Sequence, residues 1–154
     1  MTEMVDLLIQ HGLILTQDNN HRILSDTDIA VKSSQIVSIG KNLPYQCENV
    51  IDASRKVVMP GLVDSHMHET LTRGVCEDLP LNRWLDEICF PLDRSHTYDT
   101  IYAAALMNQL EMIRGGITTF IDIYRFPGAC AEVATRSGLR GIFVPQIMIS
   151  PSDV

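Results

Sequence analysis

The feature that most constrains the fold is a regular alternation of strand-like and helix-like segments in the second half of the chain. Short apolar, β-branched runs are separated by stretches with helical periodicity, and glycine or proline marks most junctions. Strands joined through helices pair in parallel, so the pattern predicts an α/β fold with a parallel sheet. The predicted segments are a strand ending at His68, a helix between Thr97 and Gly115, a strand at 117–123, a helix at 129–136 and a strand at 140–147.

The first 56 residues follow a different pattern. Residues 5–16 read as a pair of strands broken at Gly12, and residues 28–40 read as a hairpin that turns at Ser33 and Ser34. We expect these short strands to form a small β-sandwich. The predicted domains are an N-terminal β domain at 1–56 and the α/β part at 57–154.

A long excursion from Glu69 to Arg94 follows the first predicted strand of the α/β part. Within it, residues 81–90 predict one short helix that Pro91 stops. The main helix then begins after Thr97, a residue type that caps helix N-termini. The apolar face expected for this helix is Ile101, Ala104, Ala105, Leu110 and Ile113.

The strand before this excursion ends in two histidines, His66 and His68. A spacing of two residues places both imidazoles on the same face of a strand. Imidazole nitrogens bind Zn²⁺ or Fe²⁺ at about 2.0–2.2 Å, and barrels and open α/β folds carry their active sites at the C-terminal ends of parallel strands. The pair is therefore predicted to supply two metal ligands, while an isolated His-x-His is also compatible with a solvated surface pair.

Residues 57–68 resemble the signature of the amidohydrolase superfamily, in which a Pro-Gly turn leads into the first strand of a TIM barrel ending in His-x-His. The chain is similar to the branch that contains the S-adenosylhomocysteine and methylthioadenosine deaminases and the triazine chlorohydrolases and aminohydrolases. The resemblance implies a small β-sandwich, which a C-terminal segment completes in the family, followed by the first βα units of a TIM (β/α)₈ barrel. Further stretches that carry it are residues 72–74, 77–81, 84–85, 90–92 and 110–122.

The chain is short for the fold that it resembles. A (β/α)₈ barrel needs about 250 residues, whereas the chain has 154, of which the first 56 belong to the β domain. We therefore expect the N-terminal portion of a longer protein, with strands one to three of an incomplete barrel and a homo-oligomeric assembly when complete. Two alternatives are a homologue that keeps the barrel as a non-catalytic scaffold and a fragment without activity of its own.

The resemblance also implies a chemistry. One divalent transition metal, zinc or alternatively iron, lowers the pKa of bound water from about 15.7 towards 7, and the resulting hydroxide attacks an electrophilic carbon. The expected reaction is hydrolysis of a C–N or C–Cl bond on a purine-like or triazine-like ring, most simply deamination. The family's remaining ligands and acid/base residues are expected beyond Val154, so only His66 and His68 are carried over as metal ligands.

Two further residues match substrate contacts of nucleoside-type members. Trp84, the only tryptophan, matches a tryptophan that packs near the ligand, although an indole on a short helix is as often part of a core. Asp93 matches a carboxylate that binds ribose hydroxyls. It is one methylene shorter than the family's usual glutamate, which argues against adenosine-type specificity.

Other polar residues near these motifs have weaker interpretations. We expect Glu69 to be a solvated loop carboxylate, or else a polar contact in the site, and His96 to face water. Asp122 ends a strand and either orients a ligand or caps the next element. Arg73 is expected to hold the loop through an ion pair with Glu77 and Asp78.

Composition narrows the range of partners. The net charge of −7 argues against nucleic acid, because phosphate binding depends on clustered Lys and Arg. No run of about 18 apolar residues could span a membrane, and the acidic N-terminus does not resemble an export signal. Scattered cysteines without a Cys-x-x-Cys motif are expected to be reduced, which fits the cytoplasm. The expected partner is a small heterocyclic substrate.

Overall fold

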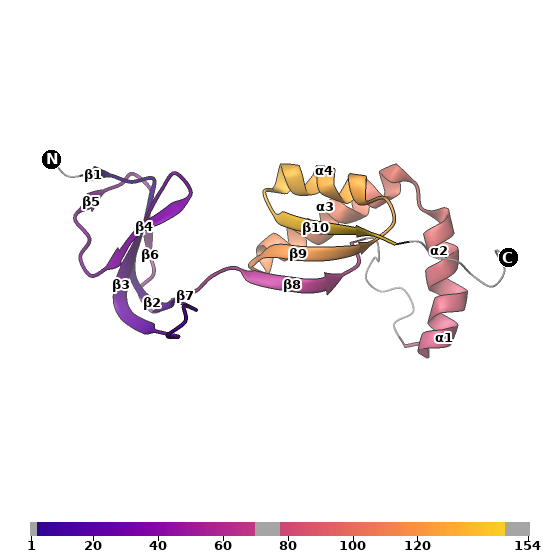
Figure 1. Cartoon of the computed structure of the whole chain (residues 1–154), viewed down its shortest axis with the longest axis horizontal. Helices are drawn as coiled ribbons and strands as arrows, with labels where there is room; N and C mark the ends of the chain where they lie inside the picture. Colours follow the sequence, from indigo (N-terminus) through magenta and orange to yellow (C-terminus); the bar gives the residue numbers. More distant parts are fainter. Residues whose placement is uncertain (1–2, 70–77, 147–154) are drawn as a thin grey trace. The chain divides into compact units, whose positions relative to one another are not determined.

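The computed structural model describes residues 3–69 and 78–146. The chain divides into two compact units, Met1–Pro60 and Gly61–Val154, which are described separately below (Figure 1). No helix in these described stretches is long and apolar enough to cross a membrane.

The first unit is built from strands alone (Figure 1). Its main sheet has the order β4-β3-β2-β6, β7 also pairs with β2, and β1 and β5 form a separate two-stranded sheet. The predicted hairpin is confirmed, because β3 and β4 pair antiparallel around Ser33 and Ser34, both with positive φ. The strands are β1 (Glu3–Met4), β2 (Leu7–Leu15), β3 (Ile23–Lys32), β4 (Gln35–Gly40), β5 (Tyr45–Gln46), β6 (Val50–Asp52) and β7 (Val57–Val58).

The predicted break at Gly12 is wrong, since β2 runs through it as one strand. The irregularity is a change in the pairing register with β3 on both sides of Gly12, next to His11 at φ 62°. A Cβ on Gly12 would lie 2.8 Å from Cγ2 of Val58. The glycine therefore permits the close approach of β7 rather than ending the strand.

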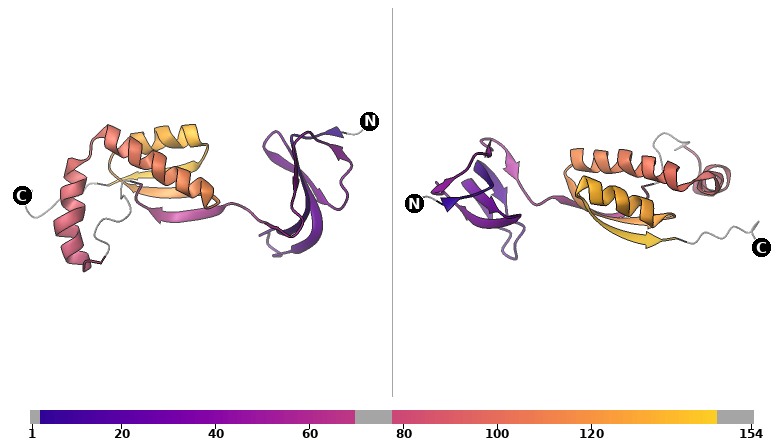
Figure 2. Two further views of the ribbon diagram at one scale, coloured as in Figure 1. Left: turned by 180° about the vertical axis from the view of Figure 1, so that it is seen from behind. Right: turned by 90° about the horizontal axis from the view of Figure 1, so that it is seen from above.

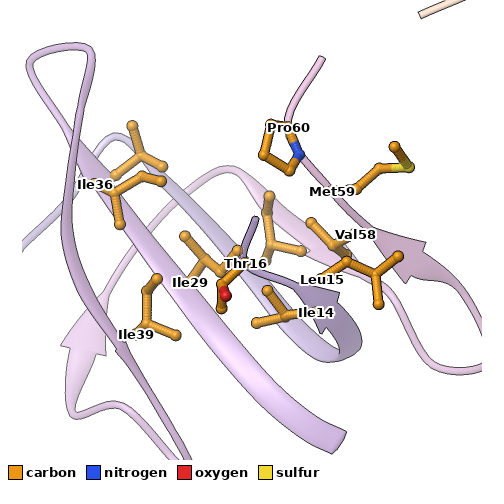
Figure 3. A pocket seen from close by; sticks show the side chains of 11 residues that line it. Ile14, Leu15, Thr16, Ile29, Ile36, Ile39, Val58, Met59 and Pro60 are labelled. Atoms are coloured by element: carbon orange, nitrogen blue, oxygen red, sulfur yellow. The ribbon is translucent and has the colours of Figure 1, made fainter. Parts of the chain in front are cut away.

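One face of the main sheet in the first unit is open and apolar. A cavity of about 280 Å³ lies on it (Figure 3). Isoleucines from three neighbouring strands line it together with Val58, Met59 and Pro60 from the segment that leaves the unit. Ile36 and Ile39 on β4 are 61% and 41% exposed, so this face lacks a covering layer among the described residues.

The second unit is a three-stranded parallel sheet in the order β10-β9-β8, as the alternating pattern predicted. Helices α3 and α4 lie side by side on one face of it (Figures 1 and 2). On the other face, Val63, Ile142 and Val144 are exposed. The elements are β8 (Leu62–Met67), α3 (Tyr98–Arg114), β9 (Ile117–Tyr124), α4 (Pro127–Ser137) and β10 (Arg140–Pro145).

Helix α3 begins and ends as predicted. Thr97 and Thr100 form a reciprocal capping box, and Gly115 follows the last turn, with Gly116 at φ +79°. The predicted apolar face is correct in its first half only, because Leu110 and Ile113 are about half exposed. The buried residues of α3 are Ile101, Ala104, Ala105, Gln109 and Met112.

The predicted stop at Pro91 is wrong. The segment stays helical through α1 (Leu81–Trp84), a π-helical stretch (Leu85–Cys89) and α2 (Phe90–Ser95). A proline ring clashes with the carbonyl four residues earlier in an α-helix. Here the wider π turn directly precedes the proline, which stands in the first turn of α2 where its missing N–H costs nothing.

Candidate metal centre

The two histidines lie at the C-terminal end of β8. The pairing of β8 with β9 shifts register between Asp64 and Met67, so β8 carries one extra residue at this point. Met67 then packs against the core under α3 and α4. Its neighbours His66 and His68 consequently lie on the opposite face of the strand. Their ring centroids are 4.9 Å apart with the planes at 85°.

The His68 ring is fixed by a hydrogen bond to the next strand. Its Nδ1 lies 2.7 Å from the carbonyl oxygen of Ile123. A carbonyl can only accept, so Nδ1 carries a proton, and in the neutral imidazole Nε2 then keeps its lone pair. Metal-bound histidines are commonly oriented in this way by a hydrogen bond at the second ring nitrogen. His66 is exposed and His68 is half-buried, so both rings are candidates for a metal site at this edge of the sheet.

An aromatic residue at the end of β9 connects this pair with a third histidine. The ring of Tyr124 lies 5.7 Å from that of His68 and 6.4 Å from that of His96, measured between centroids. The expectation that His96 faces water is wrong. It is half-buried, its Nε2 is enclosed without a hydrogen-bond partner, and burial lowers its pKa. A neutral imidazole at this position is therefore favoured.

Glu69 is not the solvated loop residue that the sequence suggests, because it is completely buried. Its backbone N–H donates to Oδ1 of Asp122 at 2.9 Å, and its carbonyl accepts from the Asn108 side chain. Among the described residues, neither oxygen of its carboxyl group has a hydrogen-bond partner of good geometry. Glu69 thus turns inward under helix α3, whereas His68 beside it lies on the other face of the strand.

Glu69 belongs to a buried polar cluster with Asp122 and Cys130, whose ligand-type atoms all lie within 4.8 Å of one another. Burial raises the pKa of Glu69 to about 7 and also raises the pKa values of Asp122 and Cys130. Nearby negative charge adds to the shifts of Glu69 and Cys130. The cluster therefore favours protonated forms, since a buried charge without a counter-charge is costly.

The two predicted substrate contacts lie on the helical segment before α3. Trp84 is half-buried in α1. Asp93 in α2 is buried, and its Oδ2 lies 2.7 Å from Nε of Arg125, which directly follows β9. Burial raises the pKa of Asp93 although Arg125 opposes the shift. Oδ1 of Asp93 is buried and has no hydrogen-bond partner among the described residues.

Several predictions fall on a part of the chain for which no structure is described. Arg73 and Glu77, and with them the proposed loop ion pair, lie outside the described residues, as does Cys76. The three described cysteines are free, as expected: Cys47, Cys89 and Cys130.

Sequence reasoning missed Arg125, Asn108 and Cys130. No local motif marks these residues, because each acts through a contact with a distant segment. A weak signal existed for Arg125, which stands directly after a strand at the edge where the histidines lie.

Comparison with known proteins identifies relatives for the whole chain. The amidohydrolase family profile matches residues 57–151. A 5-methylthioadenosine/S-adenosylhomocysteine deaminase from Thermococcus onnurineus is 40% identical over 139 residues, which are 89% of this chain and 32% of that protein. A 5'-deoxyadenosine deaminase from Methanosarcina barkeri is 34% identical over the same shares. The chain therefore spans about a third of the length of these curated relatives.

Solved structures with the same fold include two zinc-bound hydrolases. An adenosine deaminase from Xanthomonas campestris with bound zinc superposes with a TM-score of 0.85 at 29% identity, over 92% of this chain and 34% of that one. The atrazine chlorohydrolase of Arthrobacter aurescens complexed with zinc gives 0.82 at 27% identity, over 96% and 37%. The mixed α/β fold and the profile match agree, and the chain belongs to the amidohydrolase family.

Proposed function

We propose that this chain supplies the metal-holding first part of a hydrolase that releases ammonia from an amino-substituted purine-like or triazine-like ring. The observation that carries the proposal is the geometry of His66 and His68, with the His68 ring held by Ile123 so that Nε2 is free to bind. Imidazole nitrogens suit zinc, and both zinc-bound relatives above are hydrolases of ring substituents by name. Zinc is therefore the proposed metal, with iron as the alternative.

A divalent metal held by His66 and His68 would supply an activated water for hydrolysis at the ring carbon. The residues of this chain would hold the metal and orient its ligands. His66 and His68 donate imidazole nitrogens, and the carbonyl of Ile123 fixes the tautomer of His68. Further ligands and the acid/base residue are proposed to come from chain outside the described residues.

For the substrate, we propose that Trp84 packs against the ring and that the free Oδ1 of Asp93 accepts from a substrate hydroxyl. Support comes from the half-buried position of Trp84 and from the buried, unpaired oxygen of a carboxylate that Arg125 contacts. The names of the most similar relatives favour 5'-substituted adenosines, and the triazine hydrolases favour triazines.

We also propose a larger architecture around the chain. The open apolar face of the first unit fits a β-sandwich completed by another segment, and the exposed face of β8, β9 and β10 fits the interior of a closed barrel. Val57 and Val58 pair with β2, and the compact units meet at Pro60. We therefore place the domain boundary at this turn rather than after residue 56. Cytoplasmic location and homo-oligomeric assembly remain part of the proposal.

Metal analysis of the full-length protein tests the central assignment. We expect about one zinc per chain, and His66→Ala or His68→Ala should remove it, because losing one of few ligands also opens the shell to water. His21→Ala is the matched control, since His21 lies in a loop of the first unit. Equal metal content in all four proteins would overturn the assignment.

Activity assays then address the substrate. Ammonia release is measured from adenosine, 5'-deoxyadenosine, methylthioadenosine, S-adenosylhomocysteine and triazine amines. Trp84→Ala should lower kcat/KM more than it lowers Tm if the indole contacts the substrate. A loss of stability with unchanged kcat/KM would assign Trp84 to the core instead.

A further inference from the structure

The backbone that follows His68 is held by a buried side chain from the neighbouring strand. Oδ1 of Asp122 accepts the N–H of Glu69 at 2.9 Å across 53 positions of sequence. Asp122 is 1% exposed and lies on the same face of β9 as Phe120, which packs under α3 and α4. Its carboxylate therefore acts from the face opposite to the histidines.

This contact takes the place of a backbone hydrogen bond between β8 and β9. The last residue pair between β8 and β9 is Met67 with Asp122, so the ladder ends before Glu69. The N–H of Glu69 belongs to the peptide group that joins it to His68. An acceptor on that N–H consequently fixes ψ of His68, and with it the direction in which the ring leaves the backbone.

The opposite side of Glu69 is held as well. Its carbonyl accepts a hydrogen bond from the Asn108 side chain on α3. Meanwhile the His68 ring donates from Nδ1 to the carbonyl of Ile123, the residue after Asp122. Two consecutive residues of β9 thus hold His68, one through its ring and one through the adjoining peptide.

We propose that Asp122 is a positioning residue for the metal ligand His68. The inference rests on the proposed function, since it presupposes that Nε2 of His68 binds the metal. Fixing both the ring and the peptide plane places the Nε2 lone pair before the metal arrives, so less conformational freedom is lost on binding. Groups that orient a ligand in this way commonly change metal affinity by about 10- to 100-fold when removed.

A purely structural role makes a different prediction. Asp122 also belongs to the buried cluster with Glu69 and Cys130. If it served only to fill that cluster, replacing it would lower stability and leave the metal affinity of the folded protein unchanged. Cys130→Ala is the matched control, because Cys130 shares the cluster but makes no hydrogen bond to the backbone next to His68 in the described structure.

The test is the Zn²⁺ affinity of the full-length protein, measured by competition with a chromophoric chelator, alongside Tm of the metal-free form. Asp122→Leu keeps the branched shape and removes the acceptor, so affinity should fall by about 10- to 100-fold. Asp122→Asn keeps an oxygen for the same N–H, and we expect a change within about threefold. Cys130→Ala should lower Tm and stay within the same limit.

Each outcome decides between the readings. Unchanged affinity in Asp122→Leu, or an equal loss in Cys130→Ala, overturns the positioning role. If Asp122→Leu does not fold, Asp122→Ala decides, because the smaller side chain also removes the acceptor from the N–H of Glu69. Unchanged affinity in that variant also overturns the role. His68→Ala separates the proposed function from the positioning role of Asp122. If His68→Ala retains zinc, the proposed function fails. If His68→Ala loses zinc but the Asp122 variants bind zinc as tightly as wild type, only the positioning role fails.

Discussion

Two buried carboxyl groups, Asp28 in the first unit and Glu69 in the second, have opposite surroundings. In the first unit, Asp28 is buried and both its oxygens accept backbone N–H groups, from His11 at 3.0 Å and from Leu43 at 3.2 Å. In the second unit, Glu69 is buried and neither oxygen of its carboxyl group has a partner of good geometry. A fully paired carboxylate stabilises the fold, whereas an unpaired one costs free energy that only another benefit can offset.

The difference follows from the local backbone. Asp28 faces the irregular stretch of β2 at His11, where the change of register leaves an N–H without a strand partner. The carboxylate repairs that gap. Glu69 instead stands where β8 ends beside the histidines, and its carboxyl group is buried without a hydrogen bond of good geometry among the described residues. Unsatisfied polar groups of this kind concentrate at functional sites.

The strongest test of this comparison is the pH dependence of stability that Glu69 should cause. Its pKa rises from 4.5 to about 7 on folding, so the folded state binds the proton more tightly. The stabilising contribution is therefore complete below pH 4.5 and is lost as the pH rises to 7, by on the order of 3 kcal/mol. Glu69→Gln should remove this loss in the metal-free protein. The measurement is urea unfolding between about pH 4 and pH 8, which includes the unfolded and the folded pKa of Glu69. Parallel pH profiles for variant and wild type would contradict the prediction.

A smaller effect is expected at the paired carboxylate. Asp28→Ala removes the acceptor from two backbone N–H groups and should lower the free energy of unfolding by about 2–3 kcal/mol. Asp28→Asn keeps one carbonyl oxygen and should lose roughly half as much. Zinc content, which the second unit is proposed to determine, should stay unchanged in both variants. A loss of metal in Asp28→Ala would contradict the prediction that Asp28 affects stability without affecting metal binding.

Local signals predicted much of the fold. Thr97 and Gly115 mark the two ends of α3 because caps are properties of a few neighbouring residues. The hairpin at Ser33 and Ser34 and the pairing of His66 with His68 depend on spacing alone, and the structure has both. These features need no knowledge of the rest of the chain.

Predictions failed where distant contacts decide. Glu69 looks like a loop residue until Asp122, 53 positions later, takes its N–H. Asp93 gives no sign in sequence that Arg125 will pair with it. Proline is a strong sequence signal for the end of a helix, so Pro91 predicts a stop. The preceding π turn, which accommodates its ring, has no sequence signal as strong. The sequence thus points to the histidines and to Asp122, but not to the contact between Asp122 and the backbone beside His68.

The smallest effect should come from the exposed charges of the first unit. Nζ of Lys32 lies 2.8 Å from Oε1 of Glu3, and both side chains are largely solvated at 42% and 60% exposure. The Glu3 carboxylate raises the pKa of Lys32, but water and salt screen such a pair and ordering two long side chains opposes it. Lys32→Met should therefore leave Tm unchanged within error at moderate salt, measured beside Asp28→Ala. A drop in Tm comparable to that of Asp28→Ala would mean that exposed pairs also stabilise the first unit. Burial would then not explain why Asp28 and Glu69 differ in their effect on stability.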